Sequence, residues 1–133
     1  MGLDMYGYTM RAEYAEERQT DVSVEKKKKK EAAQVTDIAY WRKFNHLHGW
    51  MEELYREKFG RQDTFNCCNV RLELEDLARL EADLDGEKLE HTPGFFFGDD
   101  KIYPEDIAET KAFIEKARAA IGAGLAVFYD SWW

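Results

Sequence analysis

The chain is poor in the residue types that build covalently or metal-stapled folds. It holds only two cysteines, the adjacent Cys67 and Cys68, and three histidines. Neighbouring cysteines rarely bridge each other, because the geometry is strained, and without spaced cysteine pairs a structural zinc site is not expected. We expect two reduced, mostly buried thiols. At 133 residues, a hydrophobic core can support one domain over residues 1–133 without such devices.

Long hydrophobic runs are also absent. No stretch of about 18 apolar residues occurs, so the sequence predicts no membrane-spanning helix. The opening residues, MGLDMYGYTM, lack the basic and apolar regions of a secretory signal. Tyr6 occupies the position at which N-myristoylation requires Ser or Thr. We therefore expect a cytoplasmic protein with no membrane partner.

Positive charge is scarce outside one segment. Five consecutive lysines, Lys26–Lys30, contribute +5 to a net charge of −8, so the rest of the chain carries −13. A body this acidic is repelled by nucleic-acid phosphates, so direct binding of DNA or RNA is not expected. It is attracted instead to basic surfaces, including those with which other proteins bind nucleic acid.

The longest helical pattern spans Val35–Gly60. Thr36 or Asp37 is suited to cap its start, and Gly60 is suited to close its end in the left-handed conformation. Apolar residues recur at steps of four and three, which places them on one helix face. These residues are Tyr40, Phe44, Leu47, Met51 and Leu54.

The other segments combine strand and helix patterns. Alternating apolar residues predict strands over Leu3–Tyr14, Asn69–Leu72 and Leu125–Trp133. Helical spacing predicts helices over Glu73–Leu84 and from Pro104 to Gly122. The order of elements predicts an α+β domain in which three helices pack on a small, mostly antiparallel sheet that includes both terminal strands. Residues 17–34, which contain the lysine run, are predicted to form a mobile basic loop.

Two groups of side chains are suited to bind a protein partner. The helix predicted over Glu73–Leu84 has an acid-rich face, and the chain as a whole is 14% aromatic. Aromatic side chains anchor many interfaces, and acidic ones complement a basic partner. The candidate contacts are Glu73, Glu75, Asp76, Glu81, Asp83, Phe96, Trp132 and Trp133. The structural alternative is a solvated acidic face and aromatic rings packed in the core.

A second row on the long helical pattern combines aromatic and polar side chains. With Asp4 and a phenylalanine, it is a candidate pocket for a small molecule or nucleotide. The residues are Asp4, Trp41, Arg42, Asn45, His48 and Phe95. Arg42 would pair with a phosphate or carboxylate, and Asn45 would read a base edge.

The same row also has a catalytic and a structural interpretation. In a catalytic site, His48 would be the general base and Asp4 would orient it. In a structural network, Arg42 would pair with Asp4, and Asn45 and His48 would bond to the backbone. No glycine-rich phosphate loop accompanies the row, and no catalytic arrangement is recognisable. We therefore expect no enzymatic activity, no cofactor and no metal.

Three motifs resemble a family of small, largely uncharacterised phage and prophage proteins. These are the opening MGLDMYGY, the segment YWRKFNHLHGW, and GFFFG followed later by FY-x-S-W. The family pattern falls on Met1–Tyr6, Tyr40–Lys43, Asn45 and His48, and this chain departs from it at Phe44 and Gly49.

The resemblance implies an accessory viral protein, and it supplies no known activity that could be transferred to this chain. Proteins of that kind often bind and disable host defence machinery, as anti-CRISPR proteins do. The resemblance and the acidic body together predict an inhibitor that binds a host protein or ribonucleoprotein defence complex at its nucleic-acid-binding surface. The sequence leaves open whether the chain self-associates.

Overall fold

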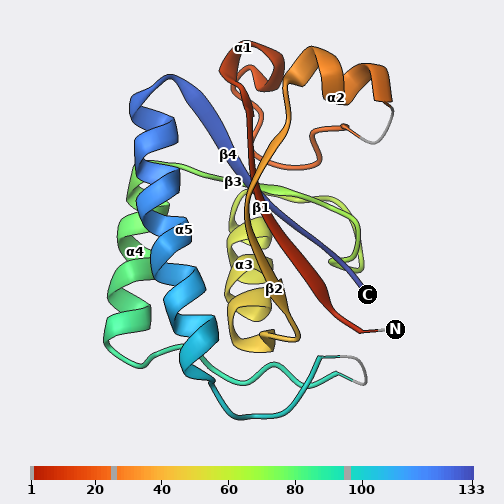
Figure 1. The fold of residues 1–133 in the computed structure, drawn as a ribbon. Coiled ribbons are helices and arrows are strands. Elements are labelled where there is room, and N and C mark those ends of the chain that lie inside the picture. The colour runs from red at the N-terminus through yellow and green to blue at the C-terminus, as the bar shows by residue number, and fades with distance from the viewer. Residues whose placement is uncertain (1, 25–26, 95–96) are drawn as a thin grey trace.

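The computed structural model describes residues 2–24, 27–94 and 97–133. Over these residues the chain forms four strands and five helices (Figure 1). In chain order they are β1 (Asp4–Arg11), α1 (Ala12–Ala15), α2 (Lys27–Ala33), β2 (Thr36–Arg42), α3 (Asn45–Glu57), β3 (Val70–Leu72), α4 (Leu74–Asp85), α5 (Pro104–Gly122) and β4 (Leu125–Trp132). None of the described helices is long and apolar enough to cross a membrane.

The strands form one sheet in the order β2-β1-β4-β3, and each described pair is antiparallel. The α+β class and the inclusion of both terminal strands are confirmed. The prediction of three helices is wrong, because two short helices, α1 and α2, lie between β1 and β2.

One face of the sheet packs against α3, α4 and α5 and forms the main core. Met5 and Val127 of the sheet meet Leu47 of α3, Leu77 of α4 and Phe113 of α5, and all five are fully buried. The close approach of α5 depends on a glycine in β1. A Cβ atom at Gly7 would lie 2.6 Å from a ring carbon of Phe113.

The pattern predicted as one helix over Val35–Gly60 forms a strand and a shorter helix. Burial alternates along β2, where Ala39 and Trp41 are buried while Tyr40 and Arg42 are exposed. Lys43 then turns the chain with a φ of +57° and α3 follows. The ladder of hydrogen bonds to β1 and the strand preference of aromatic and β-branched residues outweigh the helical spacing here.

The second half of that pattern is helical, as predicted. Leu47, Met51 and Leu54 are buried on one face of α3. The left-handed residue at its end is Phe59, with a φ of +65°, instead of Gly60. Gly60 is required for a different reason, because a Cβ atom there would lie 2.3 Å from the ring of Tyr55.

A β-bulge changes which side chains reach the second face of the sheet. Gly7 lies opposite Ala39, but Tyr8 lies opposite Asp37, so Ile38 is the extra residue of β2. An extra residue exchanges the two faces of the strand beyond it. Ile38 accordingly packs against the main core, and Asp37 shares the second face with Tyr8.

The second face of the sheet is covered over one half only. There α1, α2 and the segment around Val22 and Val24 pack on Tyr8, Met10 and Phe128. In Figure 1 these helices lie at one end of the sheet, and the two chain ends lie at the other. Residues 27–33 of the loop predicted over residues 17–34 form helix α2, while residues 25–26 lie outside the described residues. The mobility of the loop remains a prediction.

Both edges of the sheet are occupied by hydrogen bonds from other parts of the chain. At β2, the Tyr40 N–H donates to Glu109 Oε2 at 3.2 Å, and Lys116 Nζ donates to the Ile38 carbonyl at 3.4 Å. At β3, the Arg71 N–H donates to the Gln19 carbonyl at 2.7 Å. Addition of a partner strand at either edge would displace these bonds.

Candidate functional site

The residues predicted to form a pocket are divided between two layers of the fold. Arg42 lies on the exposed side of β2, where its Nη1 is 2.9 Å from Asp4 Oδ1. Trp41 faces the main core, and its Nε1 donates to Thr110 Oγ1 at 3.0 Å. Because β2 and α3 are separate elements, this row does not share one helix face. Phe95 lies outside the described residues.

Asn45 is a buried hydrogen-bonding centre at the start of α3. Its Nδ2 donates to the carbonyls of Phe97 and Asp99, at 3.0 and 2.8 Å. Its Oδ1 accepts from the Thr92 N–H at 2.9 Å and faces His91 Nδ1 at 3.0 Å. Because Oδ1 can only accept, His91 Nδ1 carries a proton. All the capacity of the amide is used within the fold, which supports the structural interpretation of Asn45.

His48 is enclosed by aromatic rings. Its Nδ1 lies 2.7 Å from the Tyr129 hydroxyl, and the rings of Phe65 and Phe97 have centroids 5.0 and 5.1 Å from its own. Burial lowers the pKa of His48 to about 4, so the imidazole is neutral at pH 7 and accepts the hydroxyl proton at Nδ1. Trp133 packs on Phe97 and donates from Nε1 to the Phe65 carbonyl at 3.0 Å. These contacts are those of a core residue, and they do not support the interpretation of His48 as a general base.

His46, which the sequence analysis did not single out, has an unusual surrounding. Its Nε2 lies 3.0 Å from the carbonyl of Asp100, and because a carbonyl only accepts, Nε2 carries the proton. Nδ1 is then a lone pair, buried without a hydrogen-bond partner in the described part of the chain. Burial lowers the pKa of His46. Although the ring of His91 lies 5.7 Å away, no three His, Cys, Asp or Glu side chains among the described residues converge as metal ligands.

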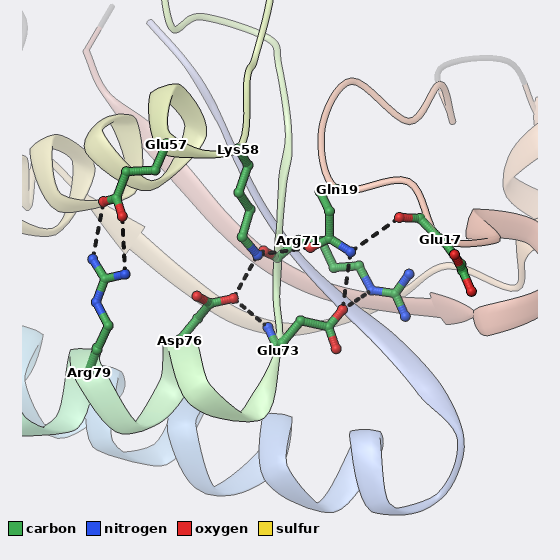
Figure 2. Close-up of polar contacts among 8 residues, drawn as sticks. All are labelled: Glu17, Gln19, Glu57, Lys58, Arg71, Glu73, Asp76 and Arg79. Carbon is green, nitrogen blue, oxygen red and sulfur yellow. Dashed lines mark hydrogen bonds and ion pairs between the residues drawn. The ribbon is translucent and has the colours of Figure 1, made fainter.

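Helix α4, predicted to present contact charges, uses two of its acids in a network at its own start (Figure 2). Glu73 and Asp76 form a reciprocal capping box. Asp76 is buried, and its Oδ2 is 2.6 Å from Lys58 Nζ, which also donates to Gln19 Oε1 at 2.9 Å. Glu73 Oε1 pairs with Arg71 Nε at 2.8 Å. These contacts join three segments of the chain, so the two acids serve the fold.

The next two predicted contact acids are also engaged within the fold. Glu81 holds Arg118 through two hydrogen bonds of 2.9 and 3.0 Å, and Asp83 accepts from Trp50 Nε1 at 2.9 Å. Glu75 is the exposed member of the predicted set. The acids of α4 are therefore less suited to a partner than their position in the sequence indicates.

The uncovered half of the second sheet face carries a regular array of aromatic and acidic side chains, here called the open face. The strand register places Asp4 between Arg42 and Trp132, and Tyr6 between Tyr40 and Asp130. The bulge adds Asp37 beside Tyr8. The members are Asp4, Tyr6, Asp37, Tyr40, Arg42, Asp130 and Trp132, and the buried Tyr8 lies at the border with the covered half.

Two rings of the open face are directed to solvent. Trp132 is 67% exposed and Tyr40 is 47% exposed, which places them among the largest exposed apolar side chains described. The rings of Tyr6 and Tyr40 lie 5.4 Å apart. Of the aromatic contacts predicted, Trp132 is thus exposed and Trp133 is packed in the fold, while Phe96 lies outside the described residues.

A pocket of about 500 Å³ lies between the open face and the segments that cover the other half of the second sheet face. We call it the acid–aromatic pocket. Its lining comes from β1, β2, β4 and helix α2 with its flanking segments, together with an exposed thiol, Cys67, which was expected to be buried. The lining residues are Tyr6, Tyr8, Val24, Lys30, Val35, Asp37, Cys67, Asp130, Ser131 and Trp132.

The electrostatics of the pocket are dominated by two carboxylates. Burial and the nearby charge of Asp37 raise the pKa of Asp130 to about 6, against the opposing effects of Lys30 and a hydrogen bond from the Tyr8 hydroxyl. Asn69 Nδ2 donates to that hydroxyl at 2.9 Å and so orients it. Among the described residues no ion pair within 4.0 Å involves Asp37 or Asp130. Within the described part of the chain, the two acids thus lie near each other without an ion pair to a cation.

Tyr6, Asp37 and Asp130 were not predicted as site residues. Alternation along the last strand could have placed Asp130 and Trp132 on one face, together with Phe128. Asp37 could not be found in that way, because its position depends on the bulge. Comparison with protein-family models, curated protein sequences and solved structures found no match to this chain.

Proposed function

We propose that the protein is a non-enzymatic binding protein that docks its open face on a basic surface of a protein partner. The observation that carries the proposal is the pair Asp37 and Asp130, which form no ion pair with any described residue and lie on the same face as the exposed rings of Trp132 and Tyr40. A basic side chain of a partner would supply the missing countercharge, and the rings would supply apolar contact area.

Charge complementarity selects the partner class. Outside Lys26–Lys30 the chain carries −13, so a basic protein surface is attracted to it and nucleic acid is repelled. Basic surfaces of this kind occur on nucleic-acid-handling complexes. Together with the resemblance to phage proteins, this supports an inhibitor or adaptor of a host defence complex in the host cytoplasm, similar in role to anti-CRISPR proteins.

The open face fits this role better than the other candidate surfaces. Strand addition would displace the bonds that Glu109 and Lys116 make to the β2 edge. The acids of α4 are largely held by Lys58, Arg118 and Trp50. The open face requires no such displacement, because the rings of Trp132 and Tyr40 are already exposed and no described residue forms an ion pair with Asp37 or Asp130.

The test compares two immobilised variants with the wild-type chain in host lysate. The Asp37→Asn/Asp130→Asn variant removes two of the three carboxylates of the open face and keeps Asp4, which pairs with Arg42. The Glu75→Gln/Glu53→Gln variant removes the same charge from exposed positions elsewhere. A stoichiometric partner should be retained by wild type and by the control, and should be lost from the open-face variant. Retention should also weaken as salt rises, because charges beyond about 8 Å are screened at physiological ionic strength.

Equal retention by both variants would overturn the assignment of the open face. A co-purifying small molecule without a protein partner would overturn the proposal as a whole.

A further inference from the structure

We infer that the acid–aromatic pocket takes one lysine or arginine side chain of a polypeptide partner, and that Lys30 of the chain's own helix α2 opposes its entry. This inference rests on the proposed function and names the contact at its centre. It also gives Lys30 a role, namely competition with the cationic side chain of the partner. The proposed function assigns no role to the lysine run.

The lining of the pocket favours a ligand that joins a positive charge to an apolar chain, as lysine and arginine side chains do. The lining includes the aromatic residues Tyr6, Tyr8 and Trp132 and the acidic residues Asp37 and Asp130. Ammonium and guanidinium groups bind both kinds of group, while the methylene stems of lysine and arginine pack along rings. An anion would be repelled by the two carboxylates. A neutral apolar group would desolvate Asp130 further and give it no partner.

The acceptor end of the pocket is oriented before any ligand enters. Tyr8 is buried, its hydroxyl accepts from Asn69 Nδ2 and donates to Asp130, and Asn69 also donates to the Val22 carbonyl at 2.6 Å. The bond from Asn69 therefore orients the Tyr8 hydroxyl, whose proton is left to interact with Asp130. The remaining acceptor positions of the Asp130 carboxylate suit the fork of a guanidinium or the three donors of an ammonium group.

Lys30 already lines the pocket without closing it. Its charge lowers the pKa of Asp130, yet it forms none of the ion pairs found among the described residues. A ligand cation entering the pocket would be brought close to this like charge. Removal of the Lys30 charge should consequently favour a cationic ligand, whereas it would weaken the binding of an anionic one.

The test measures binding of a fluorescein-labelled six-residue arginine peptide by anisotropy at low salt. Asp130→Asn should weaken binding roughly tenfold, because a hydrogen-bonded charge pair is lost, while the exposed control Glu75→Gln should have little effect. Lys30→Gln should tighten binding roughly two- to fivefold. The melting temperature of each variant shows whether it is folded, and the Asp37→Asn variant provides a second probe of the same pair of acids.

The outcomes separate the inference from the proposed function. Weakening by Asp130→Asn and Asp37→Asn with tightening by Lys30→Gln supports the inference. Peptide binding that responds no more to these variants than to Glu75→Gln overturns the pocket and leaves the proposed function standing. Weaker peptide binding by Lys30→Gln overturns the inference that Lys30 opposes entry of a cation. Spermidine binding as tight as peptide binding overturns the inference that the cation belongs to a polypeptide. Absence of binding to any basic peptide, together with equal retention in lysate, overturns the proposed function as well.

Discussion

Replacing Asn45 with alanine removes four hydrogen bonds at the start of α3. Two of them hold the carbonyls of Phe97 and Asp99, and the other two hold Thr92 and His91. Each bond contributes about 1 kcal/mol net, but the groups that are only partly buried can turn to water. We therefore expect Asn45→Ala to lower the free energy of unfolding by about 2–3 kcal/mol, with the Phe97 bond the largest share because it is fully buried.

The assay is urea unfolding followed by circular dichroism at pH 7. With a slope of about 2 kcal/mol per molar urea, the midpoint should fall by about 1 M. Thr92→Ala is the matched control, because it alters the same segment but keeps the N–H that Asn45 accepts. It should cost less than Asn45→Ala.

A second substitution, Asn45→Asp, tests whether the side chain of residue 45 must donate hydrogen bonds to the carbonyls of Phe97 and Asp99. In Asn45→Asp, a carboxylate would face the two carbonyl oxygens, so the pKa of the new acid should be raised in the folded state. The variant should then lose stability as pH rises through that pKa and recover it at lower pH. A loss of less than about 0.5 kcal/mol in Asn45→Ala, the size of an ordinary surface change, would refute the reasoning.

Four other expectations follow from the contacts described. Asp130→Asn should stabilise the fold at pH 7 by about 3 kcal/mol, because the folded-state pKa of about 6 lies above the ordinary value of 3.8, and this gain should disappear as pH falls below about 4. The contribution of His48 to stability should fall as pH falls from about 6.5 towards 4, because the unfolded chain takes up a proton at His48 that the folded chain refuses; Asp130 acts in the opposite direction over this range, so the effect is measured as the pH-dependent difference between wild type and His48→Gln in denaturant titrations. Lys58→Met should cost about 3 kcal/mol in urea unfolding, because it leaves the buried carboxylate of Asp76 without its partner, and a cost below about 1 kcal/mol would show that water replaces the pair. Replacing Lys26–Lys30 with glutamine should leave the melting temperature within a few degrees of wild type, because the described side chains of this run are exposed, and a larger fall would mean that the run is tied into the fold.

Strong local signals explain the parts of the fold that could be predicted from sequence. The strands β1, β3 and β4 have clear alternation, α4 is stopped at Gly86, and α5 begins at Pro104. In these segments the local preference and the tertiary packing agree. Residues 36–42 are the exception, because their apolar spacing fits a helix as well as a strand. The pairing with β1 decides between the two, and that contact is not local.

The site was less predictable than the fold for a related reason. Trp132 was predicted from the sequence as a candidate partner contact, with packing in the core as the alternative, and its side chain is exposed. Asp37 reaches the same face only because Ile38 is the extra residue of a bulge. Asn45 and His48 were correctly seen as chemically versatile, but their partners come from residues 91–99 and from Tyr129, which lie far along the chain. The sequence shows that these polar side chains are present, but it does not show which distant residues they contact.

The pairing of β1 with β4 has a consequence for how the chain reaches its folded state. Asp4 lies opposite Trp132 and Arg11 opposite Leu125, so the two central strands of the sheet come from the two ends of this sequence. Closing so long a loop carries an entropic cost that must be met before the pairing stabilises anything, and contacts of this kind slow folding. During synthesis, β1 and its neighbour β2 would emerge early as a two-stranded ribbon, which is only marginally stable by itself. The open face, which needs all three strands, would therefore be completed only when β4 has been made.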